Sequence, residues 1–159
     1  MTKGRRTLDF ASPKLIRPDV ELLLRGHRTV GRWSLAQVLN HCAMTANWSI
    51  DGFLTKPAPR VVRMVLGGLA KRSMLGKRRI PEGFPLPKPY HPRPGLDLNA
   101  EVAAFGVAID RVIRHEGPFA KHPLFESMSR DEWRVYHCVH CAHHLSFVIP
   151  TDQSNGAHA

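Results

Sequence analysis

The segment from Trp133 to Phe147 constrains the fold more than any other part of the chain, because four of the ten histidines fall within eight residues there. A Ser-x-x-Glu capping box precedes it at Ser129–Glu132 and Pro150 follows it, which predicts one helix over roughly residues 130–149. At 100° per residue one stripe of this helix holds Trp133, His137, His140, His144 and Phe147. We expect this stripe to face inward.

His140 and His144 are separated by one helical turn, so two imidazole nitrogens can point at one cation. Two ligands do not make a metal site, and a third must come from another helix. His41 lies at the edge of the apolar face of a helix predicted over residues 34–51, where it can turn inward at a seam between helices. The alternative is that these are hydrogen-bonded histidines of the core without a metal.

Turn and capping signals divide the remaining chain into helices. A short or kinked helix is expected at Asp19–Arg25, and a capping box at Ser34–Gln37 opens the next helix, which Gly52 ends. Further helices are expected over about residues 60–75 and from Asp97 or Asn99 to about His115. No segment shows the alternation of a strand. The pattern predicts an all-α fold, a bundle of four principal helices.

Two features interrupt this pattern. Residues 79–95 hold six prolines, which predicts a long extended crossover of the kind that often covers a cleft. The pair Gly67–Gly68 lies inside the helix expected at 60–75, so either another backbone approaches closely there or the helix bends. We expect an N-terminal arm at residues 1–11, a single domain at 12–150 and a flexible tail at 151–159.

The formal charge of +10 permits attraction to anionic partners. The basic residues cluster at the N-terminus and between Arg60 and Arg79 without interleaved aromatics, so we do not expect nucleic acid to be the partner. The basic helix is interpreted as a solvated face, or as a guide for an anionic ligand. No apolar run is long enough to span a membrane, and no membrane contact is expected.

The three cysteines, Cys42, Cys138 and Cys141, do not form a disulfide framework and fit a reducing cytoplasm. Charged residues follow Arg5-Arg6 where an export signal needs an apolar region, so we expect a cytoplasmic protein. Cys138-x-x-Cys141 lacks the second ligand pair of a structural zinc site. We therefore interpret the cysteines as small apolar residues between helices.

Three strings of the chain carry a resemblance: Arg5-Arg6-Thr7-Leu8-x-Phe10, Gly31-x-Trp33-Ser34-Leu35-x-Gln37-x-Leu39-Asn40-His41 and His140-x-x-His143-His144-Leu145-Ser146-Phe147. Together they resemble the DinB/YfiT-like superfamily, and more narrowly a bacterial branch of it that is catalogued as a domain of unknown function. The resemblance implies a DinB-like four-helix bundle with a divalent metal, such as zinc or nickel, on three histidines.

Carried over residue by residue, the resemblance implies His41, His140 and His144 as metal ligands. His143 replaces His144 if the last helix is rotated, and Cys42 could approach the site from the second helix. Some relatives act with low-molecular-weight thiols, others are described as metal-dependent hydrolases, and members often form dimers. The resemblance therefore implies a possible homodimer, whereas the substrate stays unknown.

Our first hypothesis is a cytoplasmic metal-dependent enzyme that acts with a low-molecular-weight thiol as a transferase. A hydrolase is the first alternative, although its general base cannot be assigned among generic candidates such as Asp51, Glu101 and Glu132. The second is a non-catalytic bundle that binds a partner and holds a structural metal or none. A basic nucleic-acid binder is the third, and it predicts steep loss of binding with salt.

Overall fold

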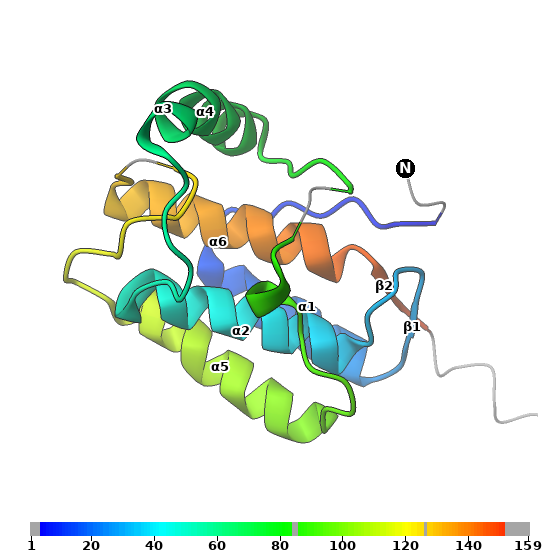
Figure 1. The fold of residues 1–159 in the computed structure, drawn as a ribbon. Helices are drawn as coiled ribbons and strands as arrows, with labels where there is room; N and C mark the ends of the chain where they lie inside the picture. The colour runs from blue at the N-terminus through cyan, green and yellow to red at the C-terminus, as the bar shows by residue number, and fades with distance from the viewer. Residues whose placement is uncertain (1–3, 84–85, 126, 152–159) are drawn as a thin grey trace, which may run out of the picture.

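The computed structural model describes residues 4–83, 86–125 and 127–151, and most of them are helical (Figure 1). The longer helices are α1 (Ile16–Leu24), α2 (Leu35–Asp51), α4 (Gly68–Lys77), α5 (Leu98–Arg114) and α6 (Arg130–Leu145). Shorter elements are η1 (Pro13–Leu15), α3 (Arg60–Val62), η2 (Arg63–Gly67), η3 (Lys88–Tyr90) and the strands β1 (His27–Thr29) and β2 (Val148–Pro150).

Helices α1, α2, α5 and α6 share one apolar core (Figure 1). Each contributes a fully buried aliphatic side chain to it: Ile16, Leu39, Ile109 and Leu145. The expectation of a mostly helical protein is therefore confirmed. Among the described residues, no helix has both the length and the apolar character needed to cross a bilayer.

Side chains cap the starts of α2, α5 and α6 where the sequence predicted them. The Ser34 hydroxyl accepts a hydrogen bond from the Gln37 amide, and the Gln37 side chain accepts one from the Ser34 amide. Ser129 and Glu132 form the same reciprocal pair at α6. The Asp97 carboxylate caps α5. These bonds satisfy amides that have no partner within the helix.

The end of α6 differs from the prediction. The helix stops at Leu145 rather than near residue 149, and Val148–Pro150 forms a strand that pairs antiparallel with β1 in the register His27↔Pro150. The expectation that the chain has no strand is therefore wrong. Each strand has three residues, which is too short for alternation to show in a sequence.

The first helix also starts earlier than predicted. It begins at Ile16, and Pro18 lies in its first turn. A proline is tolerated there because the amides of the first turn have no acceptor within the helix. The prediction that the firm part of the helix begins at Asp19 is therefore wrong, because Pro18 does not interrupt the helix.

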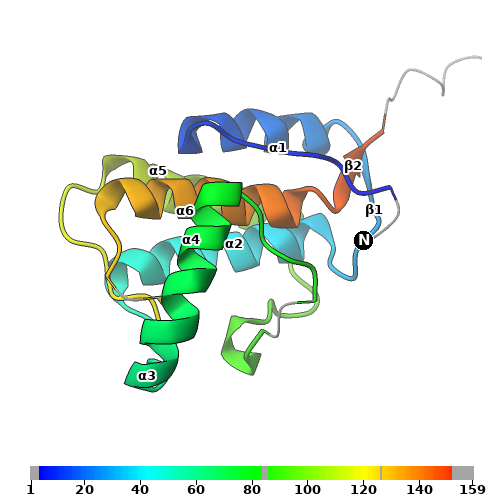
Figure 2. The same ribbon diagram turned by 90° about the horizontal axis from the view of Figure 1, so that it is seen from above.

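The helix expected over residues 60–75 lies outside the main core, across α6 (Figure 2). It consists of α3, the π-helical turn η2 and α4. Its inner side packs on a second apolar cluster formed by Met74, Phe125, Trp133, Tyr136 and Val139. Helix α6 is thereby enclosed by apolar clusters on two sides.

The two central glycines of this segment have different surroundings. A Cβ atom on Gly67 would lie 2.3 Å from the carbonyl oxygen of Leu124, whereas a Cβ on Gly68 would meet no atom within 4 Å. The sequence left open whether another backbone approaches the glycine pair or the helix bends. Another backbone does approach closely at Gly67, and the π-helical turn ends there.

We predict opposite effects of alanine at these neighbouring positions. Gly67→Ala should lower the free energy of unfolding by about 1–3 kcal/mol, because the Leu124 backbone must move. Gly68→Ala should leave it unchanged or raise it by up to about 1 kcal/mol, because alanine favours the helix. Urea unfolding of both variants measures this, and equal effects would contradict the close contact.

Candidate metal centre

Three histidines from α2 and α6 converge beneath the crossover. His41 comes from α2, and His140 and His144 come from successive turns of α6. Their ligand nitrogens all lie within 4.8 Å of one another. The sequence singled out these three residues, and the structure brings them together because α2 and α6 pack side by side in the core.

A backbone contact fixes the proton on His41. Its Nδ1 atom lies 2.8 Å from the carbonyl oxygen of Tyr90, which can only accept a hydrogen bond, so Nδ1 must carry the hydrogen. In the neutral ring, Nε2 then presents its lone pair to the other two histidines. Metal-binding histidines are commonly oriented by such a bond to their second nitrogen.

The spacing of the nitrogens suits a small divalent cation. The Nε2 atoms of His41 and His140 are 3.1 Å apart. Two imidazole nitrogens on one tetrahedral zinc ion would be about 3.3 Å apart, given a metal–nitrogen distance of about 2.0–2.1 Å. His144 completes the group, with its ring centroid 4.5 Å from that of His41 and 4.7 Å from that of His140.

Burial keeps the three imidazoles neutral. It lowers the pKa of His41 to about 4, against the opposing hydrogen bond to Tyr90. Burial, and then the neighbouring histidines, hold the pKa of His140 and of His144 well below the ordinary value. Neutral imidazoles gathered in this way supply the uncharged nitrogens that a metal cation needs as ligands, and burial disfavours an additional proton on them.

One nitrogen of the group remains without a partner. His140 Nδ1 is buried, and no hydrogen-bond partner for it lies among the described residues. The flat face of the same ring is stacked on Tyr136, with the planes inclined by 8°. The position of His140 is therefore set by ring packing, and its Nε2 atom is the one that meets His41.

His143, the alternative ligand, is engaged elsewhere. Its Nδ1 atom lies 3.1 Å from the Arg5 guanidinium, which also donates to the His143 carbonyl and to Glu82. Burial lowers the pKa of His143 to about 4, with the charge of Arg5 acting in the same direction. Rather than joining the triad, His143 holds the N-terminal segment against α6.

The cysteines lie beside the triad, in the main core. Cys42, Cys138 and Cys141 are free thiols, all buried. A hydrogen bond with Cys42, followed by burial, holds the pKa of Cys141 well above its ordinary value. Among the described residues, no cysteine belongs to the group of converging ligand atoms. The thiols therefore occupy the core as small apolar groups.

The generic acidic candidates have other partners. Asp51 pairs with Arg111 at the exposed end of α2, and Glu132 caps α6 and pairs with Lys71. Glu101 accepts a hydrogen bond from the side chain of Asn40. None of these carboxylates belongs to the ligand group.

Sequence reasoning missed two residues that shape this centre. Trp33 stacks on His144 with centroids 5.3 Å apart and also contacts His41. Tyr90 supplies the carbonyl that orients His41, and its ring packs on Trp48. Trp33 stands in the motif before α2 and could have been assigned to the site. The Tyr90 contact is made by a backbone atom, for which the sequence has no signal.

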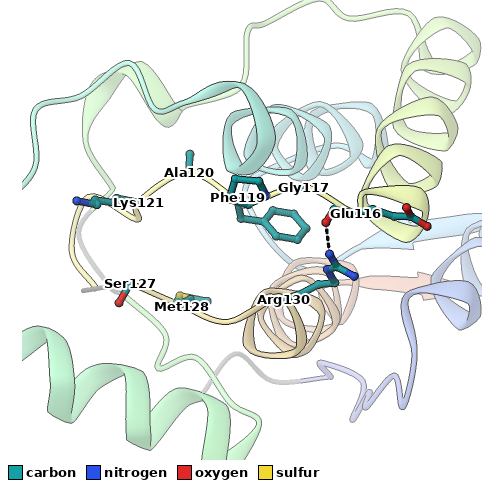
Figure 3. Close-up of a pocket in the computed structure, with 9 residues that line it drawn as sticks. Glu116, Gly117, Phe119, Ala120, Lys121, Ser127, Met128 and Arg130 are labelled. Carbon is teal, nitrogen blue, oxygen red and sulfur yellow. Dashed lines mark hydrogen bonds between the residues drawn. The ribbon is translucent and has the colours of Figure 1, made fainter.

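A hollow of about 410 Å³ is bordered by the loop between α5 and α6 (Figure 3). Residues 116–121 border one side of it, and Ser127, Met128 and Arg130 border the other. The Arg130 guanidinium donates a hydrogen bond to the Glu116 carbonyl across one end. No triad histidine lines the hollow, so we assign the candidate site to the histidines.

A family model described as a protein of unknown function (DUF1569) matches residues 2–151. No curated protein matches the chain. No solved structure matches it either.

His137, which is not one of the three candidate ligands, leads to a prediction of how the stability of the protein depends on pH. His137 is 1% exposed, its Nε2 lies 3.0 Å from the Ser49 hydroxyl, and burial lowers its pKa to about 3. Unfolding restores a pKa near 6.5, so below this pH the unfolded chain takes up a proton that the folded chain excludes. Stability should therefore fall between pH 6.5 and 3, with about 2 kcal/mol per such histidine lost at pH 5.

Urea unfolding in the presence of a chelator at pH 7 and pH 5 measures this loss. His137→Phe should reduce the difference between the two pH values by about 2 kcal/mol, even if the variant is less stable at both. His115, which is only partly buried, is the matched control, and His115→Phe should change the difference less than His137→Phe does. An equal pH dependence in His137→Phe and the unaltered chain would show that His137 does not cause it.

Proposed function

We propose that this chain, which belongs to the DUF1569 family of proteins of unknown function, is a metal-dependent enzyme that holds a divalent ion on His41, His140 and His144. The convergence of three neutral imidazoles carries the proposal. One of them is oriented by a backbone carbonyl as metal-binding histidines commonly are. Three protein ligands on zinc, nickel or a similar ion are typical of a site that keeps a position for another ligand.

The family resemblance gives the proposal a finer form, a DinB-like four-helix bundle acting as a thiol transferase. The shared core of α1, α2, α5 and α6 supports the bundle, and the origin of the ligands on α2 and α6 matches the expected pattern. A bound metal would lower the pKa of a thiol or water toward neutrality. The cytoplasmic location and the homodimer stay predictions.

The residues around the triad have definable roles in this proposal. Trp33 and Tyr136 stack on two of the ligand rings, hold them in place and exclude water. Arg93 is attached to α2 one turn before His41, because its carbonyl accepts a hydrogen bond from Gln37. Its exposed side chain provides positive charge suited to the carboxylates of a small thiol.

A second candidate function is favoured by the burial of the site. His41 and His140 are only 2% and 6% exposed, and the Tyr90 segment lies against His41. A metal there would then be structural and would stabilise the fold of a non-catalytic protein. Access for an external ligand separates this candidate from an enzyme, whether transferase or hydrolase.

Both candidate functions require a bound metal ion, and the metal content of the purified protein tests this requirement. Untagged protein purified without chelator should contain about one divalent ion per chain by mass spectrometry. The double variant His140→Ala, His144→Ala should lose it, whereas His143→Ala, on the same helix, should retain it. No ion, and no uptake of zinc or nickel at neutral pH, would refute metal binding.

Cobalt substitution then distinguishes an enzyme with a thiol ligand from a structural site. Added cysteine or glutathione should produce a sulfur-to-cobalt charge-transfer absorption, while serine should not. Dependence on the added thiol separates this signal from any contribution of the buried cysteines. A spectrum that no thiol changes would favour the structural role and would count against the transferase.

Tyr90 should affect metal affinity without being a ligand. Its ring packs on Trp48 and its hydroxyl contacts Thr55, and these contacts position the carbonyl that orients His41. Tyr90→Ala should weaken zinc binding roughly tenfold or more in a competition assay. Tyr90→Phe keeps the ring and should bind more tightly than Tyr90→Ala. Equal affinity of all three proteins would exclude this positioning role.

A further inference from the structure

Helix α3, η2 and the start of α4 carry an apolar surface that faces water. We define the outward face as Val61, Met64, Val65 and Leu69, which are each between 56% and 73% exposed. Val61, Val65 and Leu69 recur at intervals of four, and the buried Gly67 and Met74 lie on the opposite side. The outward face is therefore the side of this segment turned away from α6.

The charge of the same segment is of one sign. Residues 52–80 include eight lysines and arginines and no aspartate or glutamate. Four of these cations are exposed and have no ion pair or hydrogen bond from their side chains to any part of the chain that the structure describes: Lys56, Arg60, Arg72 and Lys77. The segment that carries the outward face therefore also carries cations that are unpaired within the described chain.

We propose that the outward face docks on an anionic phospholipid surface. Aliphatic side chains gain by entering the boundary between head groups and acyl chains, and flanking lysines and arginines gain from the negative potential there. The segment lies at the edge of the molecule, on the far side of α6 from α2 and α5, so a flat surface can reach it (Figure 1). The close contact of Gly67 with Leu124 fixes this segment on the body.

Other occupants fit the same residues less well. In a symmetric dimer through this face, each copy would place its cations opposite those of the other, with no carboxylate in residues 52–80 to pair with them. Nucleic acid would match the charge, but the outward face has no aromatic side chain on which bases could stack. A lipid surface satisfies both the charges and the aliphatic groups.

Docking of this kind places the helix on the membrane rather than through it. It is compatible with the absence of a spanning helix in the described residues, and it revises the sequence-based expectation of no membrane contact. It also requires no metal at the histidine triad, so the protein with and without chelator should behave alike.

Flotation with lipid vesicles tests the proposal. The full chain should bind vesicles of phosphatidylglycerol and phosphatidylcholine at low salt, and should not bind phosphatidylcholine alone. The double variant Val65→Ser, Leu69→Ser should reduce partitioning roughly tenfold or more. Val107→Ser is the matched control, because Val107 is 63% exposed on α5, and it should bind as the unaltered chain does.

Circular dichroism should show that the variants keep the helical fold.

Three outcomes would overturn the proposal. One is no binding to anionic vesicles at low salt, and another is equal binding by the double variant, which would mean that net charge alone attracts the protein. The third is a stable dimer in light scattering that the double variant converts to a monomer, which would assign the outward face to a second copy of the chain.

Discussion

Burial of uncharged imidazole rings along α6 is the constraint on which the rest of the structure depends. This helix is enclosed by two apolar clusters, yet it presents His137 and His140 to the interior, each less than 7% exposed. A buried imidazole is tolerated only as the neutral ring, and its nitrogens need partners. Ser49 meets this need for His137 Nε2, and His41 meets it for His140 Nε2, whereas His140 Nδ1 has no partner among the described residues. The packing of α2 against α6 is therefore polar as well as apolar.

The C-terminal end of α6 is completed by a segment distant in sequence. At its start the capping box is local, but at its end the backbone carbonyls of His143, Leu145 and Ser146 accept hydrogen bonds from the N-terminal segment. Arg5 and Arg6 supply the guanidinium donors, and Arg6 is itself held by Asp19 of α1. Cations at a helix C-terminus also interact favourably with its dipole. The arginine pair that resembles part of an export signal here stabilises a helix end.

Local signals determined what could be predicted from the sequence. The boundaries set by Ser34, Asp97 and Ser129 depend on side chains within three residues of the amides they cap, and the spacing of His140 and His144 is a property of one helix. The interactions that escaped prediction join distant parts of the chain through backbone atoms. The pairing of β1 with β2, the Tyr90 carbonyl on His41 and the Leu124 carbonyl beside Gly67 are examples. Such contacts leave no residue pattern because any residue can supply a carbonyl group.

The position of α6 in the chain has a consequence for the newly synthesised protein. The ribosome makes this helix after α1, α2, α4 and α5, although it contacts or shares core clusters with each of them. Until Leu145 has been added, the apolar sides of those helices have no common partner, and the carbonyl acceptors for Arg5 and Arg6 do not yet exist. Completion of the main core must then wait for nearly the whole domain to leave the ribosome tunnel. During that interval the exposed helices are natural clients for chaperones.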